Sequence, residues 1–292
     1  MSENLNRSLV SPGLPLCESC MMELIVRMAV EACGEDTILF GGPCCCVMQE
    51  KTAVQYYGTM MTNMASSASG VSRALRRQGK DTTCLCIAGD GTTADIAFGC
   101  VSAAAERGER ILYICYDNEA YMNTGIQRSS TTPLGAWTNT TPVDGTSRGK
   151  NVNAKPAALL IAEHGCAYAA TANPAYMKDF KEKLAKAVEA TKHGFAYIHV
   201  LSACPTGWKA PAEKAIEMSR MATQTNYYPL WEAEYGEFRF TVNVKDRKPI
   251  TEFTKYMKRF GHLSEEEIAA LQNAVDTNYR HVARLCNEHA NG

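Results

Sequence analysis

The stretch GDGTTADIAFGCVSAAAERGERILYICYDN, residues 89–118, contains the pattern that decides the fold. An apolar run of strand length, residues 83–88, comes directly before it, and a second run covers residues 111–116. Between the two runs, apolar residues recur at the spacing of one helix face: Ile96, Ala97, Cys100, Val101 and Ala104. The stretch therefore predicts a strand, a helix and a second strand, which is the repeating unit of a parallel sheet.

The same alternation continues on both sides of this unit. Further apolar runs of strand length cover residues 37–40, 157–161 and 195–201. An earlier helix is indicated by an apolar stripe at Met21, Leu24, Ile25, Met28 and Ala32. These runs predict an α/β fold, a doubly wound parallel sheet with helices on both faces, whose ligands bind at the carboxyl ends of the strands.

A further helix is expected between two turn signals. Asn173-Pro174 is typical of an N-cap and a first helical residue, apolar residues follow at helical spacing, and Gly194 is placed to end the helix. Beyond Trp208 the pattern changes, with an extended stretch near residues 238–244. A last helix starts at Ser264, whose side chain forms a capping box with Glu267.

Composition limits the classes of function. The chain has 292 residues, 46% hydrophobic residues and a formal net charge of -1. This charge argues against nucleic acid or an anionic membrane as a partner. No signal peptide and no apolar stretch of membrane-spanning length are evident, so a cytoplasmic location is expected. The 13 cysteines then favour thiols or metal ligands over a disulfide framework.

The turn Gly89-Asp90-Gly91 predicts a phosphate and metal site. Its glycines permit a tight turn and close approach of phosphates to backbone N–H groups. Asp90 is placed to hold a divalent cation, and the next strand of a parallel sheet brings Asn118 to the same edge. Two oxygen ligands and a diphosphate suit Mg²⁺. Each motif alone is more often a plain turn, and it is their combination that indicates a site.

A glycine-aspartate-glycine turn, then a strand–helix–strand interval and an asparagine, resembles the thiamine diphosphate motif. The longer run YDNEAYMNTGIQRSS, residues 116–130, resembles more narrowly the β subunit of pyruvate and other 2-oxoacid:ferredoxin oxidoreductases. The resemblance covers roughly residues 17–208, and more loosely the later segments WEAEYG and KPITEFTKYMKRFGHL. It implies a thiamine diphosphate-binding α/β domain over residues 1–210, with an N-terminal cysteine segment. Residues 211–292 would be a C-terminal extension that packs on the domain or on a partner subunit.

The resemblance also implies roles for individual residues. Mg²⁺ would be bound by Asp90, Asn118 and the carbonyl oxygen of Ala120, and Asn123 would be the catalytic residue that faces the thiazolium and the substrate. The cofactor would contact Gly89, Asp90, Gly91, Asn118, Ala120, Thr124 and Gly125. Arg128 is placed either to meet a carboxylate or diphosphate or to brace its own loop.

Four cysteines are candidates for an electron exit. Cys17 and Cys20 form a C-x-x-C pair, a spacing that suits an iron–sulfur cluster or Zn²⁺. By resemblance, a [4Fe-4S] cluster would take Cys204 of the run CPTGW as its fourth ligand. The third would be Cys45, with Cys44 and Cys46 as alternatives.

The residues around these cysteines depart from the family pattern. Leu-Pro-Leu precedes Cys17, Met21 follows Cys20, and Gly-Pro-Cys stands where the family has Ala-Thr-Gly. Since polarity around the sulfurs tunes a cluster, the departure could accompany another potential or substrate. The remaining cysteines in apolar runs are expected to be core residues: Cys33, Cys84, Cys86, Cys100, Cys115 and Cys166.

Neither the histidines nor the glutamates are marked for chemistry by the sequence. His164, His193 and His199 lie near the expected ends of elements, so structural or solvent roles are favoured. Glu23 and Glu50 are expected to be solvated residues on helices. The resemblance implies that the glutamate that activates the aminopyrimidine ring comes from an α subunit.

The favoured hypothesis is therefore the β subunit of a 2-oxoacid:ferredoxin oxidoreductase. It would convert pyruvate and coenzyme A to acetyl-CoA and CO₂ while ferredoxin is reduced, together with α, γ and ferredoxin-like δ subunits. Oxalate or another 2-oxoacid is an alternative substrate. A second hypothesis is a non-redox thiamine diphosphate decarboxylase or synthase subunit, whose cysteines are structural or bind Zn²⁺. A third is a non-catalytic, nucleotide-binding or scaffolding α/β subunit in which the glycine-aspartate-glycine motif is only a turn.

Overall fold

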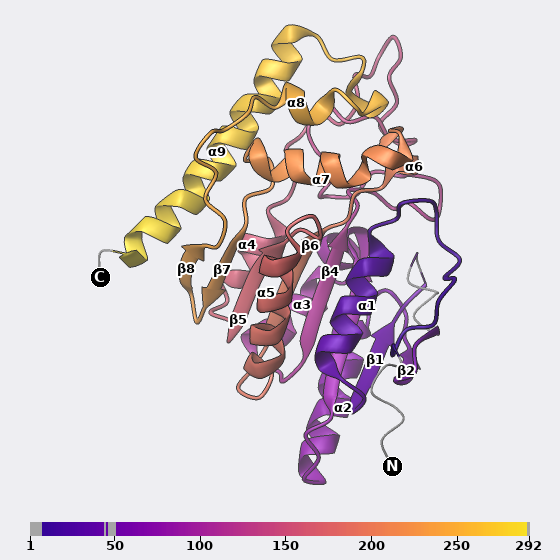
Figure 1. The fold of residues 1–292 in the computed structure, drawn as a ribbon, viewed down its shortest axis with the longest axis vertical. Coiled ribbons are helices and arrows are strands. Elements are labelled where there is room, and N and C mark those ends of the chain that lie inside the picture. The colour runs from indigo at the N-terminus through magenta and orange to yellow at the C-terminus, as the bar shows by residue number, and fades with distance from the viewer. Residues whose placement is uncertain (1–7, 44, 46–50, 291–292) are drawn as a thin grey trace.

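One sheet organises the molecule (Figure 1). The computed structural model describes residues 8–43, 45 and 51–290. Within them, strands β2, β1, β3, β4, β6, β5, β7 and β8 lie side by side in that order. The pairs from β2 to β5 are parallel, whereas β7 and β8 are antiparallel additions. The strands are β1 Thr37–Gly41, β2 Gln55–Gly58, β3 Thr83–Gly89, β4 Leu112–Asp117, β5 Tyr168–Ala172, β6 Ala196–Leu201, β7 Trp231–Glu234 and β8 Glu237–Phe240.

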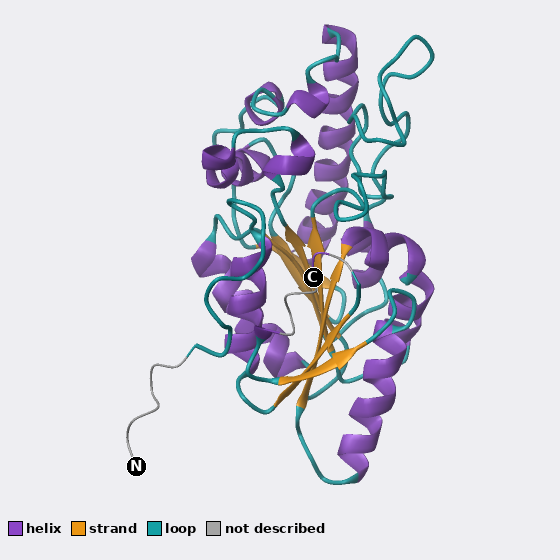
Figure 2. Ribbon diagram, turned by 90° about the vertical axis from the view of Figure 1, so that its right-hand side faces the viewer, coloured by secondary structure: helices purple, strands orange, loops and turns teal. Residues whose placement is uncertain are grey.

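Helices cover both faces of this sheet, as the view along its edge in Figure 2 shows. Helices α1 (Met22–Cys33) and α5 (Met177–Ala190) bury their apolar sides on one face. The other face is covered by α2 (Met64–Arg77), α3 (Phe98–Glu106), α4 (Ala157–Ala162) and part of α9 (Glu265–Ala290). The central strands are buried on both sides, which explains their nearly continuous apolar sequences. The doubly wound fold predicted from the sequence is confirmed.

A third layer lies beyond the carboxyl ends of the strands (Figure 1). It is built from α6 (Pro205–Trp208), α7 (Ala215–Gln224) and α8 (Thr251–Thr254), with short 3₁₀ turns at Ala212–Lys214 and Lys258–Phe260. Its apolar core includes Trp208, Met218 and Phe253. Residues 211–290 thus both extend the sheet and cover the end where a ligand of this fold binds.

Several local predictions were wrong for identifiable reasons. Residues 157–161 form helix α4, because alanine and leucine are strong helix formers and this short run has only one β-branched residue. Asn173 does not cap α5, which begins at Met177; its side chain instead donates to the carbonyl oxygen of Ser219 (2.7 Å). Strands β2, β5 and β7 were not predicted; β5 reads YAATA, where alanine hides the strand pattern.

The predicted core cysteines fall into two groups. Cys84, Cys86, Cys115 and Cys166 are buried, as expected, while Cys33 and Cys100 are partly exposed. No helix in the described ranges is long and apolar enough to cross a membrane.

The predicted capping box at the start of α9 is present. The Ser264 backbone N–H donates to Glu267 Oε2 (2.7 Å), and the Glu267 N–H donates to Ser264 Oγ (3.2 Å). Two N–H groups that the helix itself leaves free are thereby satisfied.

We expect Ser264→Ala to lower the free energy of unfolding by about 1 kcal/mol, because one of these helix N–H groups loses its acceptor. Urea denaturation of the two proteins measures the difference. Ser264→Thr keeps the hydroxyl and is the matched control, and an equal loss in both variants would contradict the capping role.

Candidate cofactor site

The loops after β3 and β4 meet at the carboxyl edge of the sheet. Gly89 at the end of β3 pairs in register with Tyr116 of β4, so the next residues of both loops emerge side by side. Asp90 and Asn118 are both buried, with exposed fractions of 1% and 7%. The parallel topology thus brings together two side chains that are far apart in the sequence.

Three oxygen-bearing groups converge there. The Asn118 side-chain amide lies against Asp90 Oδ1 and the carbonyl oxygen of Ala120, and its nitrogen donates to them at 3.0 Å and 2.8 Å. With its oxygen turned inward instead, the amide would complete a set of carboxylate, amide and carbonyl oxygens, called here the oxygen cage. These are ligands that suit Mg²⁺.

The electrostatics of Asp90 point to the same ligand. Burial raises the pKa of the Asp90 carboxyl well above its usual value, and the nearby Asp117 raises it further. An ionised carboxylate in this position needs a positive charge beside it. The donor set therefore fits Mg²⁺ at the residues predicted from the sequence.

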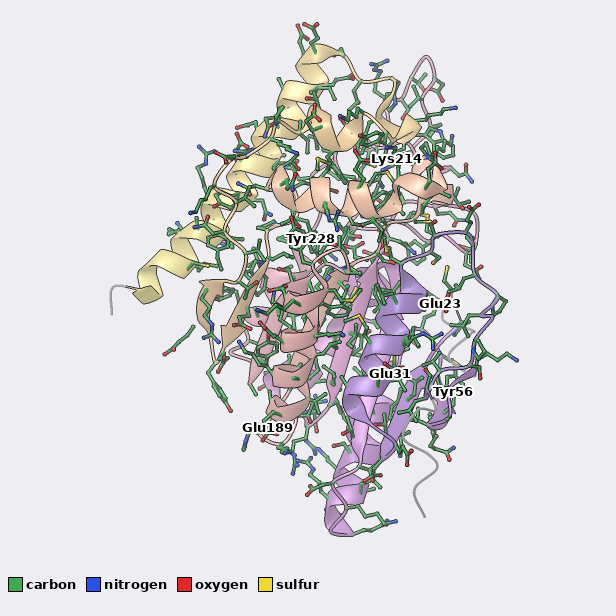
Figure 3. The ribbon with its side chains drawn as sticks, in the orientation of Figure 1. Glu23, Glu31, Tyr56, Glu189, Lys214 and Tyr228 are labelled. Atoms are coloured by element: carbon green, nitrogen blue, oxygen red, sulfur yellow. The ribbon has the colours of Figure 1, made fainter. Side chains whose placement is uncertain are left out.

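A buried hydrogen-bonded chain runs from Asp90 into the sheet. Thr131 Oγ1 lies 3.0 Å from Asp90 Oδ2 and 2.9 Å from Asp117 Oδ1. Asp117 Oδ2 lies 2.8 Å from His199 Nε2, and His199 Nδ1 lies 2.6 Å from the Tyr197 hydroxyl. The Tyr228 hydroxyl, which Figure 3 labels where the third layer meets the sheet, donates to the His199 carbonyl oxygen (2.9 Å). This chain holds the Asp90 carboxylate in one orientation.

The turn after Asp90 depends on a glycine. A β-carbon on Gly91 would lie 2.5 Å from the Tyr121 ring, whose hydroxyl donates to the Gly91 carbonyl oxygen (2.9 Å). Residues Gly91–Ile96 form a π-helix, and such turns are frequent at functional sites. Close approach of Tyr121, which belongs to the Asn118 loop, therefore ties the two loops together.

A cavity of about 270 Å³ opens beside the oxygen cage. All four cysteines expected to be ligands line it: Cys17, Cys20, Cys45 and Cys204. Asn118 and the exposed Asn123 line the same cavity. Four chain segments separated in sequence thus place thiols and the expected catalytic asparagine around one space.

The cysteine turn has its own supporting contacts. Cys204 caps the short helix α6, and the Gly207 N–H donates to Cys204 Sγ (3.4 Å). Burial is the main reason that the pKa of the Cys204 thiol is raised to about 11. The nearby Cys20 and Cys17 also raise this pKa, whereas the hydrogen bond from the Gly207 N–H lowers it. A buried thiol of this kind needs a metal to become a thiolate ligand.

The thiols do not by themselves form an assembled metal site. Over residues 8–43, 45 and 51–290, no group of three or more histidine, cysteine, aspartate or glutamate residues is arranged to hold a metal ion. Cys44 and Cys46, the alternative third ligands, lie outside the described residues, as does Glu50. The sulfur donors around one cavity suit an iron–sulfur cluster in their chemistry.

Of the predicted cofactor residues, Asn118 lines this cavity, whereas Thr124 and Gly125, like Gly89, Asp90, Gly91 and Ala120, do not. Thr124 is exposed, and its hydroxyl donates to Gln127 Oε1 (2.7 Å). The carbonyl oxygen of Gly125, which has a φ of 126°, accepts a hydrogen bond from the Asn139 side chain. Both shape the loop beyond Asn123.

Sequence reasoning missed several residues that support the site. His199 lies inside β6 rather than near an element end, and its buried contact with Asp117 gives it a structural role at the site. Lys150 is 1% exposed and donates to the carbonyl oxygens of Ser130 (2.8 Å) and Thr132. Burial, together with the nearby Arg128, lowers the pKa of Lys150 to about 8. His199 stands among apolar strand residues, which could have indicated burial, whereas nothing in the sequence marks Lys150.

Comparisons with known proteins identify the family of the chain. The model of the thiamine pyrophosphate enzyme C-terminal TPP-binding domain matches residues 44–200. NADH-dependent phenylglyoxylate dehydrogenase subunit beta of Aromatoleum evansii is 44% identical over 291 residues, which are 97% of this chain but 65% of that protein. Pyruvate synthase subunit PorB of Methanocaldococcus jannaschii is 41% identical over 280 residues, covering 91% of this chain and 93% of the relative.

A solved structure shares the fold. The 2-oxoglutarate:ferredoxin oxidoreductase from Magnetococcus marinus matches with a TM-score of 0.60 and 22% identity, over 75% of this chain and 81% of that one. The fold and the family model together assign the chain to the thiamine pyrophosphate enzymes. More narrowly, the chain belongs to the β subunits of 2-oxoacid:ferredoxin oxidoreductases.

We expect Gly91→Ala to lower the amount of thiamine diphosphate that remains bound after gel filtration by more than about tenfold. The added β-carbon would displace Tyr121 and with it the Asn118 loop. Gly99→Ala is the control, because that glycine lies in α3 with nothing within 4 Å of an added β-carbon. Retention of the cofactor by Gly91→Ala would contradict the role assigned to this turn.

Proposed function

We propose that the protein is the catalytic β subunit of a 2-oxoacid:ferredoxin oxidoreductase with pyruvate as its substrate. The observation that carries the proposal is one cavity lined by Asn118 of the oxygen cage, by Asn123 and by four cysteines. A cofactor that removes CO₂ from a 2-oxoacid releases two electrons, and a cluster within the same space would accept them singly.

Each expected group has residues suited to hold it. Asp90, Asn118 and the Ala120 carbonyl would bind Mg²⁺. Backbone N–H groups of the turn that contains Gly89 and Gly91 would approach the diphosphate. Thiamine diphosphate supplies the electron sink for decarboxylation when it is bound. Thr131 and Asp117 keep Asp90 oriented, while Asn123 presents its side chain to the open cavity.

The proposed reaction balances in atoms and electrons. A 2-oxoacid and the thiol of coenzyme A give an acyl thioester and CO₂. The carbon–carboxylate bond breaks, a carbon–sulfur bond forms, the thiol proton is released, and two ferredoxin molecules each accept one electron. A [4Fe-4S] cluster on Cys17, Cys20, Cys45 and Cys204 would relay these electrons.

Pyruvate is favoured as the substrate by the names of several relatives. Several relatives with high coverage are pyruvate synthase subunits. Others are named for larger substrates, as in ketoisovalerate oxidoreductase subunit VorB of Pyrococcus furiosus, which is 36% identical over 97% of both chains. The unusual residues around the cysteines keep oxalate and bulkier 2-oxoacids as alternative substrates.

The proposal requires an α subunit. The carboxylate of the buried Glu119, beside the site, accepts hydrogen bonds from Arg259 and Tyr227. It is therefore not free to face an aminopyrimidine ring. We assign that glutamate to the α partner, and transfer to ferredoxin to γ and ferredoxin-like δ subunits. Residues 1–210 would then hold the cofactors, and residues 211–292 would pack on them or on a partner.

The complex purified anaerobically should contain iron, sulfide and thiamine, and pyruvate with coenzyme A should produce a reduced-cluster or cofactor-radical signal in the EPR spectrum. Bound iron and cofactor without a response would discard pyruvate, and the same measurement with oxalate and branched or aromatic 2-oxoacids would follow. Cofactor without iron would favour a non-redox decarboxylase.

Replacement of single thiols tests the ligand set. We expect Cys204→Ser and Cys45→Ser to lose most of the iron while bound thiamine is retained, because the cluster needs four thiolates and the oxygen cage uses none of them. Cys44→Ser and Cys46→Ser should keep the iron, and Cys115→Ser, a change in the sheet core, is a further control. Loss of iron in Cys44→Ser or Cys46→Ser, with Cys45→Ser intact, would move the third ligand.

A further inference from the structure

Glu119, in the loop after β4, has an unusual environment. It lies between Asn118 and Ala120, the two expected Mg²⁺ ligands of that loop. Glu119 has a φ of 67° and is 3% exposed. Its backbone N–H donates to Asp117 Oδ1 (2.8 Å), and its carbonyl oxygen accepts from Thr132 Oγ1 (2.6 Å). A non-glycine residue holds such a backbone conformation only where its surroundings enforce it.

The Glu119 side chain is held from the C-terminal segment. One carboxylate oxygen accepts from the Arg259 guanidinium and the other from the Tyr227 hydroxyl. Arg259 is itself 2% exposed, so the pair is removed from water. A buried pair of this kind is costly to break from one side, because the remaining charge is left without compensation.

Arg259 also reaches the same loop by a second route. Its guanidinium carbon lies 4.2 Å from the centre of the Trp208 ring, and the Trp208 indole N–H donates to the Asn118 carbonyl oxygen (2.9 Å). Arg259 Nε is buried and has no hydrogen-bond partner among the residues described. Arg259 is therefore placed to bind Glu119 and to contact the Trp208 ring, although its own Nε–H is left without an acceptor among the described residues.

We propose that Arg259 is a positioning residue for the Mg²⁺ and diphosphate site: through Glu119 and Trp208 it fixes the loop in which Asn118 and Ala120 present their oxygens. The proposal rests on the proposed cofactor site and assigns to the C-terminal segment a specific part in cofactor affinity. Arg259 does not line the cavity, so its expected part is to position the loop rather than to take part in the chemistry.

The test is the Mg²⁺ dependence of thiamine diphosphate binding by the complex with its partner subunits, measured by equilibrium dialysis and a thiamine assay. We expect Arg259→Met to raise the Mg²⁺ concentration for half-saturation roughly 10- to 100-fold, the usual effect of removing support behind a metal ligand. Arg259→Lys keeps the charge and should recover part of the affinity.

Two further variants separate positioning from a general loss of stability. Trp208→Phe keeps a ring for Arg259 but removes the N–H that binds the Asn118 carbonyl oxygen, so it should raise the half-saturating Mg²⁺ concentration roughly two- to tenfold. Arg73→Met breaks a pair with the buried Glu109, which precedes β4 at the opposite end of the sheet. It should lower the melting temperature and leave Mg²⁺ dependence unchanged.

The outcomes distinguish this inference from the proposed function. If the wild-type complex binds no thiamine diphosphate with Mg²⁺, the proposed function fails. If it binds and both Arg259→Met and Trp208→Phe bind with wild-type Mg²⁺ dependence, the positioning role is overturned. Should Arg259→Met not fold, an unchanged Trp208→Phe overturns it alone. An equal shift in Arg73→Met would also overturn it, because the effect would then be one of global stability.

Discussion

The structure depends on one electrostatic constraint, a carboxylate buried at the carboxyl edge of a parallel sheet. Asp90 is 1% exposed and lies next to another buried carboxylate, Asp117. Such a group is tolerable when hydrogen bonds orient it and a cation neutralises it. Thr131 supplies the first condition, and the oxygens of Asn118 and Ala120 complete a set suited to Mg²⁺ for the second.

The third layer, beyond the carboxyl ends of the strands, has a structural role that follows from this constraint. A loop that presents backbone and amide oxygens inward must have its own polar groups satisfied and its conformation enforced. Trp208 does so from the end of the predicted cofactor domain, and Arg259 does so from residues that the sequence pattern describes only as a C-terminal extension. The layer also supplies the turn that holds Cys204 at the cavity. Cofactor loop and cysteine turn are thus supported by the same small group of side chains.

Predictability from the sequence differed between kinds of feature. The strands β3, β4 and β6 were recognisable because burial on both faces makes them continuously apolar. Alanine-rich β5 and the run that became α4 were not, because alanine is compatible with either structure and tertiary packing decides. His199 has one of the roles expected for it, a structural one, but its place at the site could not be predicted, because its partner Asp117 lies 82 positions away in the chain.

By itself, the sequence determined the doubly wound class, the glycine turn with its aspartate, the partner asparagine and the cysteine spacings. These features are local, since each depends on residue type, hydrophobic period or spacing within a short segment. Only the tertiary structure decided that the cysteines of three separate segments line one cavity with Asn118, and that Arg259 holds the Glu119 turn. The physical reason is that these contacts arise from the register of parallel strands and from the packing of the third layer. Both bring residues that are distant in sequence within a few ångströms of each other.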